Sequence, residues 1–131
     1  MTINQTNFPL IQQGMNNMSY TYRVYIIDLK KTVLKCPKFK ARNPKYKEGK
    51  PCVYVGSTGI NTEERFKQHV YGKKSKKGKS LSNKYAKKFG KKLRYKDMKK
   101  IRPRKTRTSI ELNEEGVAIE LQSRGWAVWC G

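Results

Sequence analysis

The alternation of apolar and polar residues predicts two strands early in the chain. Residues 20–29 read YTYRVYIIDL, a run rich in aromatic and β-branched side chains, and such runs favour extended structure. Its side chains alternate between two faces: Arg23, Tyr25 and Ile27 on one, and Tyr22, Val24 and Ile26 on the other. A second, shorter strand over residues 52–55 ends at Gly56, and Tyr54 faces away from its apolar neighbours in that strand.

A helix is predicted directly after the second strand. Asn61 and Glu64 have the spacing of a capping box, which favours a helix that begins there and runs to about Val70. Arg65 and His69 are four residues apart on this helix, so the two side chains share one face. The sequence therefore places a guanidinium and the single imidazole of the chain side by side.

The second half of the chain is predicted to contain two more helices and two more strands. One helix covers residues 82–89, and residues 91–95 form a third strand. The last helix covers residues 113–124, where Gly125 stops it. Residues 126–129, WAVW, form a closing strand.

The remaining segments have no clear period. Residues 1–19 are rich in Asn and Gln and carry no charge, so we expect a flexible N-terminal arm. Residues 30–50 are basic and broken by proline and glycine, which predicts a long loop or a ragged hairpin arm. We expect residues 20–131 to form a single domain.

The charge of the chain points to a polyanionic partner. Lys and Arg number 31 and Asp and Glu nine, a net charge of +22. Residues 72–107 hold 18 of the basic residues and one acid, Asp97, so +17 falls in this window. Nucleic acid is the expected partner, because charge of this density binds phosphate chains. We expect DNA rather than RNA, although charge does not distinguish the two. We expect seven lysines to contact it: Lys73, Lys74, Lys76, Lys77, Lys84, Lys87 and Lys88.

The same charge also fits a membrane surface or a purely solubilising role. An anionic membrane surface accepts a polybasic cluster, and a solvated basic face can serve solubility alone. No apolar run approaches the roughly 20 residues that cross a bilayer, and residues 1–22 carry no Lys or Arg for a signal peptide. We therefore expect a soluble, cytoplasmic protein with no membrane partner. The oligomeric state is not readable from the sequence.

The three cysteines give no metal or disulfide motif. Cys36, Cys52 and Cys130 form no CxxC pair, and His69 stands too far from them in the sequence to complete a recognisable zinc motif. We expect reduced thiols.

Glu115 occupies an unusual place on the last helix. On a wheel of about 100° per residue it falls between Ala118 and Ile119, within the apolar arc. A carboxylate there is costly unless it is paired or binds a cation. In the predicted helix, however, Glu115 also lies in the first turn, where the helix dipole favours an acid whatever its role. A cation site and a dipole effect both remain open.

Four motifs, taken in order along the chain, resemble the GIY-YIG nuclease superfamily. They are Arg23-Val24-Tyr25, Tyr54-Val55-Gly56, Arg65-x3-His69 and Glu115-x3-Ile119. The resemblance spans about residues 20–129. Arg23 replaces the usual glycine of the first motif, and the two tyrosines lie farther apart than is usual in that family. By this comparison, residues 30–50 and 72–107 are basic insertions.

The resemblance implies a fold and an activity. The fold would be of the α/β (α+β) type, with a small antiparallel three-stranded sheet flanked by helices. The activity would be a metal-dependent endonuclease that hydrolyses nucleic-acid phosphodiester bonds. One carboxylate is enough for Mg²⁺ (or Mn²⁺), because this cation usually completes its shell with waters and substrate oxygens.

The resemblance also implies a role for each site residue. Glu115 would bind the metal ion, with Glu111 and Glu114 as rivals, and Arg65 would hold the phosphate. Tyr25 would be the general base, Tyr54 would hydrogen-bond to water or phosphate, and His69 would act as proton relay or phosphate donor. A tyrosine that works near neutral pH needs its phenolate stabilised by roughly 4 kcal/mol for about three pKa units. Arg65, a metal ion and nearby lysines lower that pKa, whereas burial raises it.

The alternative is a non-catalytic, basic nucleic-acid-binding protein. In that case Tyr25 and Tyr54 are ordinary strand aromatics, Arg65 is a surface cation, and His69 is a structural histidine. A polybasic membrane-surface protein is a third possibility.

Overall fold

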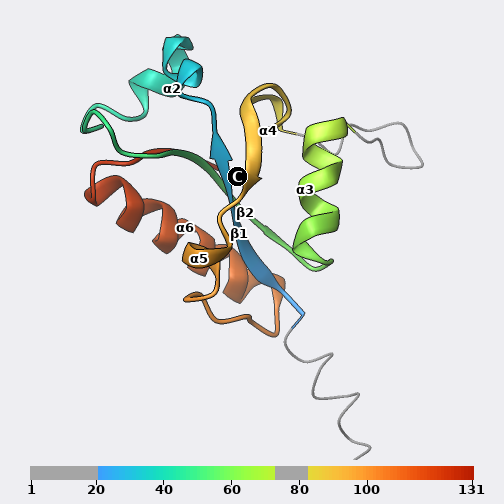
Figure 1. Cartoon of the computed structure of the whole chain (residues 1–131). Coiled ribbons are helices and arrows are strands. Elements are labelled where there is room, and N and C mark those ends of the chain that lie inside the picture. Colours follow the sequence, from blue (N-terminus) through green and yellow to red (C-terminus); the bar gives the residue numbers. More distant parts are fainter. Residues whose placement is uncertain (1–20, 73–82) are drawn as a thin grey trace, which may run out of the picture.

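A computed structural model describes residues 21–72 and 83–131 of the chain. The predicted N-terminal arm and four of the predicted binding lysines, Lys73, Lys74, Lys76 and Lys77, lie outside these residues. Within the described part the chain is a mixed α/β structure with five α-helices, one short 3₁₀-helix and four strands (Figure 1). No helix of this part is long and apolar enough to cross a membrane.

The strands form one sheet in the order β3 (Gly90–Leu93), β1 (Arg23–Leu29), β2 (Cys52–Thr58) and β4 (Ala127–Cys130). β1 is antiparallel to both β2 and β3, whereas β4 is parallel to β2. The expected three-stranded antiparallel sheet was therefore wrong, and only the mixed α/β class is confirmed. A parallel neighbour requires a long crossover, and the whole chain between β2 and β4 supplies it.

The two faces of β1 follow the predicted alternation. Tyr25, Ile27 and Leu29 belong to one core cluster, and Val24 and Ile26 belong to another. All five side chains are buried. The sheet therefore has apolar side chains on both faces, and each face needs a cover of helices.

Helices cover both faces of the sheet (Figure 1). α6 (Arg107–Ser123) supplies Ile110, Ala118 and Leu121 to the cluster on one face. The other face is covered by the 3₁₀-helix η1 (Lys31–Lys35) and by α2 (Pro37–Ala41), α3 (Thr62–Tyr71) and α4 (Lys84–Phe89). The short helix α5 (Tyr95–Met98) connects β3 to the segment before α6. The predicted cap of α3 is confirmed, because the Asn61 side chain accepts hydrogen bonds from the Glu63 and Glu64 amides.

Residues 30–50 are not the loop that the sequence predicted, because they contain η1 and α2. Val33 and Phe39 are fully buried and join the same cluster as Tyr25. The buried Asn43 fastens the segment to β4, since its side chain donates to the Val128 carbonyl and accepts from the Val128 amide at 3.1 and 2.7 Å. A segment that was expected to be irregular is thus an integral part of the core.

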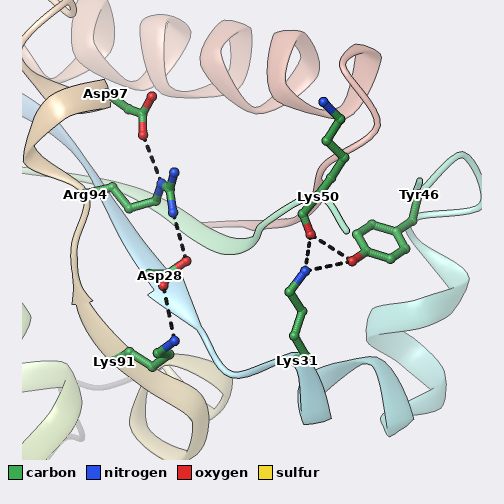
Figure 2. A network of polar contacts seen from close by, with 7 residues as sticks. All are labelled: Asp28, Lys31, Tyr46, Lys50, Lys91, Arg94 and Asp97. Atoms are coloured by element: carbon green, nitrogen blue, oxygen red, sulfur yellow. Dashed lines mark hydrogen bonds and ion pairs between the residues drawn. The ribbon is translucent and has the colours of Figure 1, made fainter. Parts of the chain in front are cut away.

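Polar contacts close this segment at its base (Figure 2). Lys31 Nζ donates to the Lys50 carbonyl and, at 3.1 Å, to the Tyr46 hydroxyl, which itself donates to the Lys50 carbonyl at 2.7 Å. Residues 19 positions apart are thereby held together. A loop closed in this way loses much of its conformational freedom.

A second polar network holds the β3 edge of the sheet (Figure 2). Arg94 links Asp28 of β1 to Asp97 of α5, at 3.1 and 2.9 Å, and Lys91 Nζ lies 3.7 Å from Asp28. Asp28 is mostly buried, so its carboxylate needs these cations. β3 and α5 both belong to the segment 72–107, so this part of the basic segment is built into the sheet and its edge.

α6 begins six residues before the predicted start. The Thr106 hydroxyl caps it by accepting from the Ser109 amide, and the helix ends before Gly125, whose φ of +88° suits glycine. Glu115 therefore lies two turns inside the helix rather than in its first turn, and the helix dipole does not explain it. The apolar arc is also narrower than predicted, because Ile119 is 61% exposed. Glu115 is itself exposed and lies outside the buried stripe of α6, so its predicted place within the apolar arc was wrong.

Candidate active site

The candidate site lies where β2 extends beyond β4. The pairing of β4 with β2 ends at Val55 and Cys130, so Gly56 and Ser57 have no β4 residue beside them. A cavity of about 390 Å³ opens at this edge. Its walls come from β1, β2, α3, α6 and the end of the chain: Tyr25, Tyr54, Gly56, Ser57, Arg65, Arg107, Glu111, Glu114, Glu115, Cys130 and Gly131.

Four of the five predicted catalytic residues line this one cavity. They are Tyr25, Tyr54, Arg65 and Glu115, and they come from β1, β2, α3 and α6. The fifth, His69, is buried behind the cavity wall and contacts Tyr25. The fold thus brings together side chains that span 90 positions of the sequence.

Gly56 makes room for the Tyr25 side chain. The two residues are direct partners in the β1–β2 ladder. A Cβ built on Gly56 would overlap the Tyr25 phenol oxygen and would come within 2.5 Å of its Cζ. The glycine of the Tyr54-Val55-Gly56 motif is therefore required by the tyrosine of the neighbouring strand.

His69 is held in one tautomer by its two neighbours. The Asn83 amide donates to Nδ1 at 2.9 Å, and Nε2 lies 2.7 Å from the Tyr25 hydroxyl oxygen. A backbone N–H can only donate, so Nδ1 carries no proton and the ring hydrogen of a neutral imidazole is on Nε2. His69 therefore donates to the oxygen of Tyr25.

The charge state of His69 agrees with this arrangement. Burial, with a smaller contribution from the positive charge of Arg65, lowers the His69 pKa from 6.5 to about 4. The ring is then neutral at pH 7, and both of its nitrogens are occupied. In this geometry His69 has no free lone pair that could accept a relayed proton. His69 is therefore placed as a hydrogen-bond donor to Tyr25 and not as the predicted proton relay.

Burial opposes ionisation of both tyrosines. It raises the Tyr25 pKa to about 12, although the Arg65 charge and hydrogen bonds from Arg65 and Tyr54 lower it. Burial and then the neighbouring Tyr25 raise the Tyr54 pKa farther. The ring centroids are 6.1 Å apart, so the two phenols titrate as a coupled pair in which Tyr25 ionises first. The hydrogen bonds directed at the Tyr25 oxygen keep the Tyr25 pKa below that of Tyr54.

Two arginines provide positive charge at the cavity. Arg65 donates from Nη1 to Gln68 Oε1 at 2.8 Å, and its charge acts on Tyr25, Tyr54 and His69. Arg107, the first residue of α6, also lines the cavity. A planar guanidinium is suited to phosphate oxygens. The cavity is therefore lined by two cationic groups whose chemistry suits a phosphate.

Three carboxylates of α6 share the cavity wall. Glu111, Glu114 and Glu115 all line it. Glu114 is half-buried and accepts a hydrogen bond from Cys130 Sγ at 3.1 Å, and its charge raises the pKa of both tyrosines. Burial and this contact raise the Cys130 pKa to about 12, so the thiol stays protonated. Among residues 21–72 and 83–131, none of the three glutamates forms an ion pair.

The carboxylates fit a hard cation by their donor chemistry. In the part of the chain that the structure describes, no group of three or more His, Cys, Asp or Glu side chains is placed to hold a metal ion by itself. Mg²⁺ usually takes one or two carboxylates and completes its shell with waters and substrate oxygens. Glutamates that form no ion pair with the described residues, in a chain with a net charge of +22, are consistent with such a partial site.

Sequence reasoning missed Arg107 and Cys130 as parts of the cavity. Arg107, Glu111 and Glu115 follow each other at four-residue spacing, which puts them on one helix face. That stripe is recognisable once the cap at Thr106 sets the helix start. Cys130 carries no signal in the sequence, because its contact with Glu114 depends on the parallel placement of β4.

The predicted binding lysines that the structure describes lie on α4, outside this cavity. Lys84, Lys87 and Lys88 are all exposed. Lys84 Nζ lies 5.1 Å from the Tyr85 ring centroid, and Lys88 Nζ lies 5.4 Å from that of Phe89. The N-cap residue of α4 is Asn83, whose amide fixes the His69 tautomer.

No protein-family model, curated protein or solved structure matches this chain.

Proposed function

We propose that this protein is a metal-dependent endonuclease of the GIY-YIG type, with DNA as the preferred substrate. The observation that carries the proposal is the cavity that joins Tyr25, Tyr54, Arg65 and Glu115, with His69 behind it. Four motifs read separately in the sequence become one polar site with phosphate-binding and proton-accepting groups.

The residues have complementary tasks in phosphodiester hydrolysis. Arg65 and Arg107 hold the scissile phosphate at the cavity wall and stabilise the charge that develops on its oxygens. Tyr25 accepts the proton of the attacking water. His69 and Tyr54 direct their hydrogens at the Tyr25 oxygen and so favour its ionised form.

The α6 carboxylates would hold the metal ion. Glu115, with Glu114 or Glu111 beside it, offers the oxygen ligands that Mg²⁺ or Mn²⁺ prefers. When bound, the ion supplies Lewis acidity and neutralises charge on the phosphate.

The raised Tyr25 pKa sets a demand on this mechanism. From a pKa of about 12, ionising Tyr25 at pH 7 costs about 7 kcal/mol, at 1.36 kcal/mol per unit. Positive charge brought into the cavity has to reduce that cost. The alternative function, a non-catalytic nucleic-acid-binding protein, draws its support from the same observation, because a neutral Tyr25 is inert as a base.

A substrate panel tests the proposal. The full chain is incubated with end-labelled single-stranded and double-stranded DNA and RNA, with Mg²⁺, Mn²⁺ or EDTA. We expect metal-dependent internal cleavage, preferentially of DNA. Glu115→Gln should reduce it by more than about tenfold, the minimum for a group that supports a metal site.

A matched control is available on the same helix. Glu120 is exposed, pairs with Arg124 at the surface, and does not line the cavity. Glu120→Gln should therefore leave cleavage unchanged. No cleavage of any substrate, or equal activity of the Glu115 and Glu120 variants, would contradict the proposal.

A further inference from the structure

A second groove lies between the segment 30–50 and α4, away from the candidate active site. It measures about 850 Å³, and its lining includes Lys35, Lys38, Lys84, Tyr85, Lys88 and Phe89. One wall belongs to η1 and α2, and the other belongs to α4. Nothing in the proposed hydrolysis uses this groove.

Four exposed lysines form its rim. Lys35 and Lys38 stand on the wall from segment 30–50, and Lys84 and Lys88 stand on α4. Within residues 21–72 and 83–131, none of the four ammonium groups forms an ion pair or a hydrogen bond. All nine acidic residues of the chain are described, and none lines the groove.

The positive charges of these four lysines repel one another, and a bound polyanion would reduce this repulsion. Lys84 and Lys88 are four residues apart on one helix, where like charges destabilise each other. Two further lysines across the groove add to that repulsion. A chain of phosphates would relieve it, and release of counterions would drive the association.

The floor of the groove indicates which polyanion. Tyr85 and Phe89 are only 4% and 7% exposed, and the lysine ammonium groups lie over their rings. They therefore present no free faces for stacking with unpaired bases, the usual basis of single-strand binding. A groove that contacts phosphates alone suits a duplex, whose bases are turned inward.

The walls of the groove are firmly held. Val33 and Phe39 anchor the segment 30–50 in the core, and Lys31 closes it through the Lys50 carbonyl (Figure 2). α4 contacts both η1 and α3, and the amide of its N-cap residue, Asn83, donates to His69. The groove thus lies on the same face of the sheet as Tyr25, which belongs to the same core cluster as Tyr85 and Phe89.

We propose that the segment 30–50 and α4 together form a phosphate-binding groove for one strand of a DNA duplex, whose rim is Lys35, Lys38, Lys84 and Lys88. The proposal rests on the proposed function only in naming DNA as the ligand. The segment 30–50 then acts as half of a substrate clamp.

Salt-dependent binding tests the groove separately from cleavage. Binding of a short labelled DNA duplex is measured by fluorescence anisotropy in EDTA over a range of salt concentrations. Two double variants each remove the positive charges of one wall: Lys35→Gln with Lys38→Gln, and Lys84→Gln with Lys88→Gln. Each lost phosphate contact lowers the slope of log K against log salt by about 0.9.

The control variant removes the same charge from the same segment. Lys40 and Lys45 are exposed and lie outside the groove, so Lys40→Gln with Lys45→Gln gives the purely electrostatic effect. We expect each groove variant to weaken binding at least about tenfold and to lower the slope by about 1 to 2. The control should do neither.

Three results would overturn the proposal that this groove binds duplex DNA. The first is a loss in the groove variants no greater than in the control. The second is a loss confined to single-stranded DNA. The third is binding to anionic phosphatidylserine vesicles that depends on these lysines while duplex binding does not. Loss of cleavage with intact, groove-dependent binding would count against the nuclease proposal only. Thermal melts of all variants check that the fold is kept.

Discussion

His69 Nε2 lies 2.7 Å from the phenol oxygen of Tyr25, and both side chains are almost completely buried. Because the Asn83 amide occupies Nδ1 of the ring, the hydrogen of this bond comes from the histidine. The imidazole therefore stabilises negative charge on Tyr25, and it resists taking up a second proton of its own.

The first prediction concerns the titration of His69. Burial lowers the His69 pKa to about 4, so the ring should stay neutral until the pH falls to near that value. His69 is the only histidine of the chain, so its Cε1–H signal in an NMR titration needs no assignment by mutation. A midpoint near 6.5 would show that the ring is open to solvent and that the tautomer is not fixed.

The same shift predicts how stability depends on pH. The unfolded chain protonates its histidine near 6.5, whereas the folded chain does so only near 4. The unfolded state therefore binds more protons between these values, and stability falls as the pH decreases through this window, by on the order of 3 kcal/mol. Denaturant melts of the natural chain and of His69→Gln, compared at pH 7 and pH 4.5, should converge at the lower pH; a constant difference would contradict the prediction.

Replacing Gly56 by alanine should destabilise the protein. The new Cβ would overlap the end of the Tyr25 side chain, which is held by His69 and cannot move freely. Overpacking of this kind typically costs about 1 to 3 kcal/mol. Chemical denaturation measures the loss.

Gly116 supplies the matched control for that substitution. It lies within α6, and a Cβ there meets nothing within 4 Å. Gly116→Ala should stabilise the protein by about 0.5 to 1 kcal/mol, because alanine is the better helix former. Equal effects of the two substitutions would show that the Tyr25 contact is unimportant.

The elements that the sequence predicted well are those with local signals. β1 and β2 carry runs of β-branched and aromatic residues, and the side chain of Asn61 caps α3 within three residues. η1 and α2 have five residues each, which is too short for a helical period to be recognised. The parallel orientation of β4 depends on contacts across the whole chain, which no local pattern encodes.

The candidate site shows the same division. Tyr25, Tyr54 and Arg65 were identified from motifs and lie at one cavity. The sequence did not single out Glu115 as the metal ligand over Glu111 and Glu114 as clearly, because the predicted start of α6 put Glu115 in the first turn. With the cap at Thr106, three glutamates face the same cavity.

Asn43 should be as important for stability as any apolar core residue. Its side chain is buried and exchanges hydrogen bonds with the Phe39 carbonyl and both backbone groups of Val128. Asn43→Ala leaves the buried Val128 amide unsatisfied, which should cost about 2 to 4 kcal/mol for the lost bonds together. Gln122→Ala, which removes only an outer partner of Asn43, should cost less. Denaturation of both variants decides the matter, and similar losses would mean that residues 30–50 are not fastened through Asn43.

If Tyr25 is the general base, cleavage should depend on pH as a buried phenol requires. In the proposed mechanism only the ionised fraction of Tyr25 is active, and its pKa without added charge is about 12. The logarithm of kcat/KM should therefore rise with a slope near one across neutral pH and continue to rise to at least about pH 9, because the free-enzyme pKa governs this quantity. A histidine base would instead level off near its own pKa, and that of His69 is about 4. Tyr25→Phe keeps the ring and its packing but removes the oxygen, and should lower kcat/KM by about 10² to 10⁴. A profile that is flat above pH 7, or a Tyr25→Phe variant that retains the slope, would assign the base to another group.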